Sequence, residues 1–294
     1  MTRIVDLLRA GPTTSFEFFP PRTDEGEATL RATLRDLEPL GPSFVSITYG
    51  AGGSTRERTH RLVLDLLQHT SMPPMAHLTS VSHTREELRE ILTTYRREGV
   101  TNVLALRGDP PRDADPAEVF YALEHAVELV QLAREVGGET FTIGVAAHPA
   151  GHPTAPDLAT DRRYLAAKLE LADVAVTQFF FAAEEYARLV EDLAGLGCQK
   201  PVLPGIMPIT NIRQIERFAQ LSGTEVPVAL ADRFHALGDD DAAVRALGIE
   251  VATELCRDLL DLGAPGLHFY TLNRSTATWE IHRNLGLGSR VNSP

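Results

Sequence analysis

A single carboxylate lies inside a run that otherwise has the composition of a buried β-strand. Glu17 stands between aromatic residues in Ser15-Phe16-Glu17-Phe18-Phe19. A carboxylate in a strand is costly unless it is hydrogen-bonded or functional, although a glutamate on the hydrated face of an edge strand would also explain the pattern. In a closed barrel there is no edge. Burial there would raise the pKa of Glu17, so that the side chain stays protonated and can donate a proton near neutrality.

Three further strand-like runs end in polar side chains. Arg107-Gly108-Asp109 brings a cation, a closely approachable backbone and an anion together within one turn. Gln178 offers an amide that can pair with the edge of a planar heterocycle, and Arg274 suits a substrate carboxylate. A surface ion pair is the alternative for either arginine. Taken together, these residue types predict a large, planar, anionic ligand beside one buried acid.

Two histidines follow the fifth strand-like run. His148 and His152 are four residues apart, a spacing that on a helix would suit a metal ion. A proline follows each of them and disfavours the helical conformation, so we expect imidazoles that hydrogen-bond a ligand. A metal-dependent hydrolase or lyase that uses these two residues and His77 is the main rival hypothesis. A catalytically inactive scaffold is a third, and a buried strand acid argues against it.

Short apolar runs alternate with amphipathic runs along the whole chain. The predicted strands are residues 14–19, 44–49, 75–81, 102–107, 141–147, 174–181, 202–208 and 266–272. The predicted helices are residues 25–40, 56–68, 85–98, 118–136, 161–172, 184–196, 212–221, 242–262 and 276–285. Thr84 and Glu87 form a capping-box pattern before the third helix. Eight β-α units predict an α/β fold, a single-domain (βα)8 TIM barrel spanning residues 1–294, whose working face is the C-terminal end of the strands. The alternative is a doubly wound open sheet, but a Phe-Pro-Pro-Arg run stands where that fold carries a glycine-rich phosphate loop.

The composition of the chain disfavours several classes of partner and site. The chain has 294 residues, 28 Lys plus Arg against 40 Asp plus Glu, and a net charge of −12. This acidity disfavours nucleic acid and membrane surfaces as partners. Two cysteines support neither a disulfide framework nor a CxxC metal site, and no apolar stretch is long enough to span a membrane. We therefore expect a cytoplasmic protein, a homo-oligomer, that acts on a small molecule.

Six runs of the sequence resemble the signature runs of methylenetetrahydrofolate reductases, in order and over nearly the whole chain. They are residues 15–21, 44–51, 107–111, 177–181, 204–208 and 268–274. The resemblance, which is to the short bacterial form, implies a (βα)8 barrel that carries FAD. It also implies that NADH or NADPH reduces the flavin and leaves, after which 5,10-methylenetetrahydrofolate takes the hydride to become 5-methyltetrahydrofolate for methionine synthesis.

The resemblance also implies two catalytic residues. Glu17 matches the proton donor that opens the imidazolidine ring of the folate to an iminium, in agreement with the buried acid expected above. Asp109 matches the carboxylate beside the flavin and the pterin. Its charge is expected to disfavour the anionic reduced flavin and so to ease hydride donation.

The same motifs imply which residues of this chain bind the substrate and FAD. Gln178 matches a contact shared by NAD(P)H and folate, Gln214 a substrate contact, Phe218 a ring that stacks on the ligand, and Arg274 a further substrate contact. The expected FAD contacts are Thr48, Tyr49, Ala51, His77, Arg107, Gly108, Asp109, Ala126, His148, His152, Ala155, Asp161 and Lys168. No metal is implied.

The sequence departs from the family pattern at three positions. His148 stands where an aromatic residue, commonly Tyr, flanks the flavin, and Tyr164 and Ala167 replace Asn and Arg near the FAD phosphates or ribose. The last two changes leave fewer cations near the pyrophosphate, which predicts weaker retention of FAD. An unperturbed imidazole titrates near pH 6.5, so we also expect FAD release to depend on pH through His148.

Overall fold

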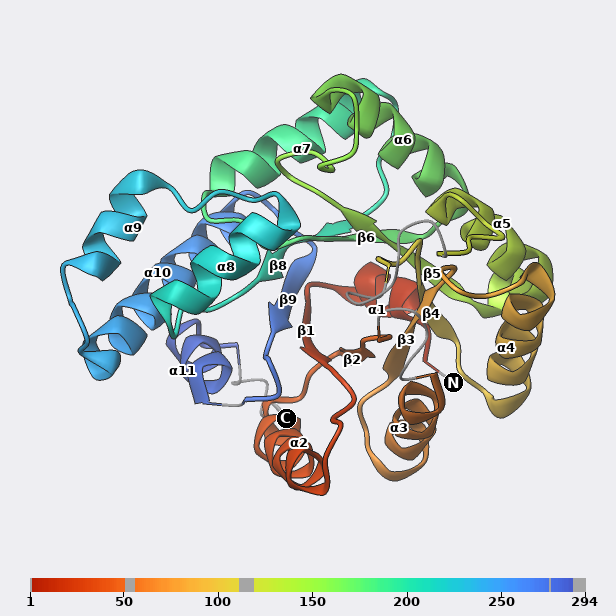
Figure 1. Cartoon of the computed structure of the whole chain (residues 1–294), viewed down its shortest axis with the longest axis horizontal. Coiled ribbons are helices and arrows are strands. Elements are labelled where there is room, and N and C mark those ends of the chain that lie inside the picture. Colours follow the sequence, from red (N-terminus) through yellow and green to blue (C-terminus); the bar gives the residue numbers. More distant parts are fainter. Residues whose placement is uncertain (1, 51–55, 111–118, 275, 288–294) are drawn as a thin grey trace.

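Parallel strands form one central sheet that is ringed by helices (Figure 1). The computed structural model describes residues 2–50, 56–110, 119–274 and 276–287. Hydrogen-bonded neighbours follow the order β7-β6-β5-β4-β3-β2-β1-β9-β8. The strands are β1 Thr13–Phe18, β2 Phe44–Ile47, β3 Pro74–Thr79, β4 Asn102–Leu106, β5 Thr142–Ala147, β6 Val174–Thr177, β7 Val202–Leu203, β8 Gly205–Ile206 and β9 Gly266–Tyr270.

The seventh position of the barrel is shared by two very short strands. The sequence predicts one strand over residues 202–208, but Pro204 divides it because a proline has no N–H to donate. On one side β7 pairs with β6, and on the other β8 pairs with β9. The carbonyl of Pro204 still accepts from the backbone N–H of His268 at 3.0 Å. The (βα)8 barrel is therefore confirmed, and nine described strands fill its eight positions.

The helices cover the outside of the sheet (Figure 1). They are α1 Ile4–Ala10, α2 Asp24–Leu37, α3 Arg56–His69, α4 Arg85–Glu98, α5 Ala126–Gly137, α6 Leu158–Leu171, α7 Ala183–Gly195, α8 Ile212–Ser222, α9 Val228–His235, α10 Asp241–Asp261 and α11 Thr276–Asn284, with 3-10 turns at Glu38–Leu40 and Gly138–Thr140. The predicted capping box of Thr84 and Glu87 is confirmed at α4. The helix predicted from residue 118 begins only at Ala126, because Tyr121 instead pairs with Val81 in an isolated bridge. Residue 118 itself lies outside the described residues.

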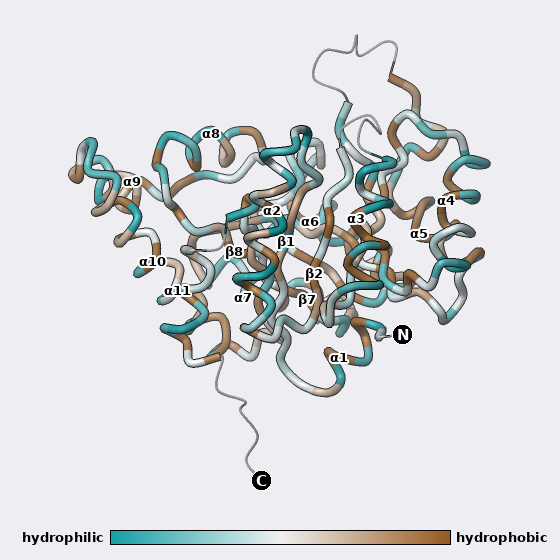
Figure 2. The backbone as a smooth tube through the Cα atoms, turned by 90° about the horizontal axis from the view of Figure 1, so that it is seen from below, coloured by the Kyte–Doolittle hydropathy of each residue, from teal (hydrophilic) through white to brown (hydrophobic). Residues whose placement is uncertain are grey.

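Helix α1, which the sequence pattern does not predict, closes one end of the barrel. Ile4 is fully buried in a cluster with inward-facing side chains of the strands, including Phe44 and Met75, and Leu8 packs against it. The backbone N–H of Ile4 donates to Oδ1 of Asn102 at 2.8 Å. Figure 2 shows α1 at one end of the barrel and α8 at the other. Polar inward-facing side chains can therefore meet a ligand only at the α8 end.

Alternation along β1 places Glu17 inside the barrel. Phe16 and Phe18 belong to the main core between the sheet and the helices. Because successive side chains of a strand point to opposite faces, Ser15 and Glu17 point inward. Register then pairs Glu17 with Ser46 of β2 on one side and with Tyr270 of β9 on the other.

Candidate active site

Glu17 is surrounded by polar side chains from three neighbouring strands. Ser46 of β2 donates its hydroxyl proton to Oε2 of Glu17 at 3.2 Å. Nε2 of His77 on β3 and Nε2 of His268 on β9 each lie 3.4 Å from the same oxygen. The side chain of Glu17 is 17% exposed, whereas those of His77 and His268 are 6% and 1% exposed. The acid is therefore enclosed by its partners and opens only toward the mouth of the barrel.

These partners reverse the effect of burial on the carboxyl group. Burial alone raises the pKa of Glu17, but the contacts with His268, His77 and Ser46 together hold it below its ordinary value. The expectation that burial raises the pKa of Glu17 above its ordinary value is therefore wrong. The reason is that β2, β3 and β9 supply groups that favour the charged form.

Two polar atoms on β3 are buried without a hydrogen bond among the described residues, although one of them, Nε2 of His77, lies 3.4 Å from Oε2 of Glu17. Nε2 of His77 and Oγ1 of Thr79 are buried and make no hydrogen bond there. Burial also lowers the pKa of His77 despite the nearby carboxylate of Glu17. Unpaired polar atoms in the interior are destabilising unless something satisfies them, so their position suits contact with a ligand.

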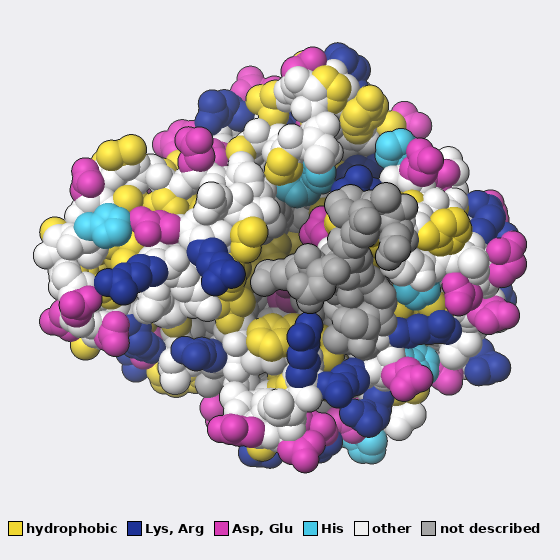
Figure 3. All heavy atoms as spheres, viewed as in Figure 1, with side chains coloured by type: hydrophobic (Ala, Val, Ile, Leu, Met, Phe, Trp, Pro, Cys, Tyr) yellow, Lys and Arg dark blue, Asp and Glu magenta, His cyan; other side chains and the backbone are white. Residues whose placement is uncertain are grey.

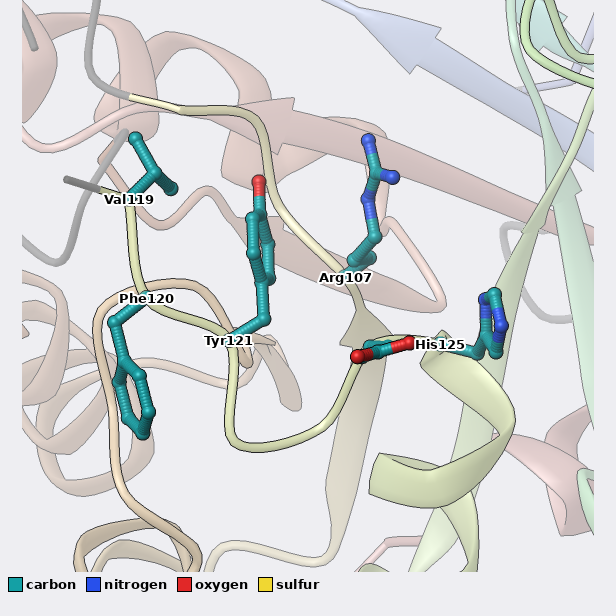
Figure 4. A pocket seen from close by; sticks show the side chains of 6 residues that line it. Arg107, Val119, Phe120, Tyr121 and His125 are labelled. Carbon is teal, nitrogen blue, oxygen red and sulfur yellow. The ribbon is translucent and has the colours of Figure 1, made fainter. Parts of the chain in front are cut away.

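The turn after β4 forms the wall of an open pocket. Gly108 has φ +81°, and a Cβ there would lie 2.7 Å from side-chain atoms of Thr79 and Val81, so this turn requires glycine. The guanidinium of Arg107 lies 5.5 Å from the ring centre of Tyr121, whose hydroxyl donates to the carbonyl of Gly108 at 3.4 Å. Figure 4 shows the Arg107 and Tyr121 side chains pointing the same way. The pocket has a volume of about 490 Å³ and also contains Val119, Phe120, Glu124 and His125.

Charged groups after β4 and β5 converge on one histidine. The pKa of His152 is lowered, first by burial and then by the positive charges of Arg107 and Lys168, while Asp109 and Asp161 act in the opposite direction. All five residues are predicted FAD contacts. The structure thus brings together residues from two strand ends and from α6. Asp109 itself is exposed on the turn.

His148 and His152 pack on each other in an edge-to-face arrangement, with ring centres 4.8 Å apart. Burial, followed by electrostatic repulsion from His152, Lys168 and Arg162, lowers the pKa of His148 to about 3. His148 is therefore neutral at ordinary pH, and the expected dependence of FAD release on its titration near pH 6.5 is wrong.

Arg162 anchors the segment that carries both histidines. Its guanidinium donates to the carbonyls of His148 at 2.9 Å and Pro149 at 2.6 Å, and it pairs with Asp161 at 3.2 Å and Asp192 at 3.1 Å. The Arg162 side chain is only 3% exposed. It fixes the backbone that presents the two imidazoles.

Lys168, also on α6, lies close to the same segment. It donates from Nζ to the carbonyl of Ala146 at 3.0 Å, and burial lowers its pKa although Asp161 opposes the shift. A buried ammonium that carries only one hydrogen bond among the described residues has donors left for an anionic ligand.

The remaining predicted FAD contacts lie on several separate segments of the chain. The Tyr49 hydroxyl contacts Nε2 of His83 at 3.1 Å, and burial raises the pKa of this tyrosine. Thr48 continues the pairing of β2 with β1 and is half-buried. Ala155 follows His152 in the same turn, whereas Ala126 begins α5. Ala51 lies outside the described residues.

The predicted substrate contacts lie on α8 and after β6 and β9. The half-buried Phe218 on α8 packs against a cluster that includes Phe179 and Tyr270. Gln178 directly follows β6, and its Oε1 accepts from the backbone N–H of Phe179 at 3.0 Å. Gln214 and Arg274 are both exposed. These residues come from the part of the chain after β6, whereas the predicted FAD contacts come from the part between β2 and α6.

Four residues of this region were missed by the sequence reasoning: Ser46, His268, Thr79 and Tyr121. The first three are inward-facing polar residues in apolar strands, the same signal that singled out Glu17, and could have been found by it. Tyr121 lies in the run that the sequence pattern predicts as a helix over residues 118–136, so no strand-end signal singles it out. Its role depends on a chain path that brings it against the turn after β4.

The residues of the rival metal hypothesis do not converge. His77 faces Glu17, whereas His148 and His152 face each other on a separate segment. Across the described ranges, no group of three or more potential ligands could hold a metal ion. Within the same ranges, no helix is long and apolar enough to cross a membrane.

Comparisons with known proteins identify the family of the chain. The family model for methylenetetrahydrofolate reductase matches residues 2–286. The chain is 37% identical over 274 residues to 5,10-methylenetetrahydrofolate reductases of Pectobacterium carotovorum and Escherichia coli (strain K12), covering 93% of this chain and 90% of each relative. It is 39% identical over 284 residues to methylenetetrahydrofolate reductase (NADH) 1 of Arabidopsis thaliana, of which it covers 48%. A solved structure of a Clostridium thermocellum protein that binds two copies of 5-methyl-5,6,7,8-tetrahydrofolic acid has the same fold, with a TM-score of 0.66, 14% identity and 98% coverage of both chains. The chain belongs to the methylenetetrahydrofolate reductase family.

Proposed function

We propose that this protein reduces 5,10-methylenetetrahydrofolate to 5-methyltetrahydrofolate, with FAD as its cofactor and NADH or NADPH as the electron donor. The observation that carries the proposal is Glu17, an acid enclosed at the mouth of the barrel of a chain that belongs to this family. The name of the plant relative, which specifies NADH, supports a nicotinamide donor. On this proposal the chain is a single catalytic barrel, works as a homo-oligomer and supplies methyl groups for methionine synthesis.

The described residues fit FAD. Arg107 and Lys168 offer cations for phosphates, and Tyr121 offers an aromatic face beside Arg107. Nε2 of His77 and Oγ1 of Thr79 offer buried hydrogen-bonding atoms without partners among the described residues. When bound, FAD supplies the hydride chemistry that links the nicotinamide to the folate. The chain's own part is to hold the cofactor between β3, β4, β5 and α6, and to orient it toward the barrel axis.

Charge at the mouth of the barrel favours an anionic ligand in spite of the net charge of −12. Basic side chains gather near the centre of the face that carries α8, and acidic ones lie mainly along its edges (Figure 3). Folate and both nicotinamide dinucleotides are anions that carry planar ring systems. We assign Gln178, Gln214, Phe218 and Arg274 to substrate binding because they match the family motifs and follow β6 and β9 or lie on α8.

Glu17 is the residue that we assign to proton delivery. Reduction of the folate consumes one proton, and Oε2 of Glu17 is an acidic atom enclosed by Ser46, His77 and His268. Asp109, exposed on the turn after β4, is assigned the role of setting the local negative potential.

An absorbance spectrum followed by two half-reactions tests the proposal. Purified protein, incubated with FAD and desalted, should show a flavin band that NADH or NADPH bleaches without oxygen, and adding both donors separately reveals the preference. Methylenetetrahydrofolate should then restore the band. In Glu17→Gln we expect bleaching to persist and restoration to slow by about 100-fold, the usual scale of general acid catalysis.

Glu90→Gln, at an exposed position of α4, is the matched control and should behave as wild type. A protein that retains no flavin, or whose flavin neither nicotinamide bleaches, would contradict the proposed function. An unchanged folate step in Glu17→Gln would contradict only the role of Glu17.

A further inference from the structure

A tight turn after β9 leads directly into Arg274. The backbone N–H of Arg274 donates to the carbonyl of Thr271 at 2.9 Å, and the two residues between them have positive φ, 51° at Leu272 and 56° at Asn273. These features are those of a type I′ turn, which normally contains glycine or asparagine at both central positions. Asparagine adopts this conformation readily, whereas leucine does so only under strain. A turn of this kind persists because contacts outside it hold it in place.

The side-chain amide of Asn273 makes two of these contacts. Its Oδ1 accepts from the backbone N–H of Phe19 at 3.0 Å, and its Nδ2 donates to the carbonyl of Phe19 at 2.8 Å. Asn273 is 6% exposed. Because an N–H can only donate and a carbonyl can only accept, this pair of contacts fixes which amide atom is oxygen and which is nitrogen. The amide is thus bound at both ends by one residue of the segment that leaves β1.

These two hydrogen bonds replace the next step of the parallel ladder between β1 and β9. The last ladder bond runs from the backbone N–H of Thr271 to the carbonyl of Glu17 at 3.4 Å. One further step would join the N–H of Phe19 to the carbonyl of Thr271, and the N–H of Asn273 to the carbonyl of Phe19. In the structure the carbonyl of Thr271 accepts from Arg274 instead, and the N–H of Asn273 donates to Oγ1 of Thr271 at 3.2 Å. The side chain of Asn273 therefore extends the sheet by one step while the main chain turns away.

Two threonines complete the support of the turn. Oγ1 of Thr271 donates to the carbonyl of Glu17 at 2.6 Å, and Oγ1 of Thr33 on α2 donates to the carbonyl of Asn273 at 2.9 Å. Both threonines are buried, whereas Arg274 is exposed. Residues of β1 and α2 thus fix the backbone that immediately precedes Arg274.

We propose that Asn273 is a positioning residue for substrate binding, whose amide takes the place of a ladder step and so fixes the main chain that carries Arg274. This inference rests on the proposed function, in which Arg274 contacts the anionic folate. Arg274 touches the substrate, and Asn273 acts through it. Glycine and aspartate can adopt the same backbone conformation, but glycine has no amide, and an aspartate carboxylate presents an oxygen to the carbonyl of Phe19.

Two variants separate the amide from the conformation of the turn. Asn273→Gly and Asn273→Asp both retain a residue that tolerates positive φ, and both lose the donor to Phe19. In each we expect the methylenetetrahydrofolate concentration that half-saturates flavin restoration to rise about tenfold or more, the scale of one lost hydrogen bond to a charged group. The rate at saturating folate should stay within about twofold of wild type, because Arg274 binds the substrate without taking part in the chemical step. Wild-type half-saturation in both variants would mean that the turn needs only a residue that tolerates positive φ, and it would overturn the inference.

A double-mutant cycle with Arg274→Gln tests whether Asn273 acts through the arginine. If it does, Asn273→Gly adds less than about twofold to the loss that Arg274→Gln causes alone. Losses that multiply, or no loss in Arg274→Gln, overturn the inference. Ser82→Gly is the matched control and should behave as wild type, because Ser82 is exposed in the turn after β3 and also has positive φ, 59°.

The nicotinamide half-reaction separates positioning from general damage to the fold. Bleaching of the flavin by NAD(P)H should proceed at the wild-type rate in every variant, because the folate is absent from that step. An equal fall of both half-reactions in Asn273→Gly and Asn273→Asp would show that the amide serves only the fold, and it would overturn the inference. A wild-type protein whose reduced flavin is not reoxidised by methylenetetrahydrofolate overturns the proposed function instead.

Hydrogen exchange followed by NMR tests the geometry without any turnover. In wild type we expect the backbone N–H of Phe19 to be protected, because it donates to the buried amide of Asn273. In Asn273→Gly its exchange should become about tenfold faster or more. The N–H of Thr48, which donates to the carbonyl of Phe18 on the other side of β1, should keep its protection and so report that the variant is folded. An unprotected Phe19 N–H in wild type, or equal exchange in the two proteins, would overturn the inference.

Discussion

Replacing Arg162 by Met should destabilise the protein far more than an arginine substitution normally does. The change retains an unbranched apolar stem and removes the guanidinium. The carbonyls of His148 and Pro149 and the carboxylate of Asp161, which is 12% exposed, then lose their donor, whereas Asp192 is 44% exposed and can turn to water. Removing one partner of a buried ion pair costs about 3–5 kcal/mol, because the other charge stays buried. We therefore expect the free energy of unfolding to fall by about 3–5 kcal/mol.

Urea unfolding followed by circular dichroism measures this loss, and the thermal midpoint should fall by about 6–10 °C at roughly 2 °C per kcal/mol. Arg163→Met is the matched control, since the Arg163 side chain is exposed and donates only to Oγ1 of Thr160 among the described residues. It should change the free energy of unfolding by less than about 0.5 kcal/mol. A loss below about 1 kcal/mol in Arg162→Met would refute the reasoning that this guanidinium anchors the segment. Faster release of FAD by the variant would link the anchor to the proposed cofactor site.

Three further predictions concern the same face of the barrel. Asp109→Asn should raise the midpoint potential of bound flavin, because it removes a negative charge beside the site; an equal or lower potential in a dye-linked titration would contradict this. Gly248→Ala should lower the urea midpoint, because the new Cβ would overlap the carbonyl oxygen of Ile209 just before α8, whereas Gly195→Ala, where a Cβ meets nothing within 4 Å, should not. His148→Phe should flatten the dependence of the unfolding free energy on pH. In the folded wild-type protein the pKa of His148 is lowered to about 3, so its imidazole stays neutral while the same residue in the unfolded chain takes up a proton below about pH 6.5. The contribution of His148 to stability is therefore complete above pH 6.5 and is lost as the pH falls toward 3. Parallel slopes of unfolding free energy against pH for the two proteins would exclude that role.

The sequence predicted the barrel because its signal is local and repeated. Alternating apolar and amphipathic runs, together with caps such as that of Thr84, mark each β-α unit without any knowledge of its neighbours. Two features of the fold that the sequence does not predict have different causes. Helix α1 has only seven residues, and its burial in the barrel end, not its own pattern, stabilises it. Pro204 divides a strand whose apolar pattern runs straight through it.

The sequence singles out many residues that lie at the candidate site, but it does not reveal how their surroundings shift their pKa values. The position of Glu17 in a strand reveals that it is buried. Its pKa, however, depends on Ser46, His77 and His268, which reach it through strand register and the closure of the barrel. A sequence pattern does not contain that register. It predicts that burial raises the pKa of Glu17, but it does not reveal the contacts that together lower this pKa below its ordinary value. At His148, by contrast, burial is the main cause of the lowered pKa, and only the fold shows that this side chain is buried.

The pairing of β1 with β9 has a consequence for how the protein is made. Ser15 and Leu267, which this pairing brings into contact, are separated by 252 residues. At about 5–20 residues per second, a ribosome needs roughly 13–50 s to pass from one to the other. During that time the free edge of β1 is available to other chains, and the carboxylate of Glu17 lacks its partner on β9. Nascent chains stalled before β9 should therefore bind chaperones strongly, and they should release them once the last strand emerges.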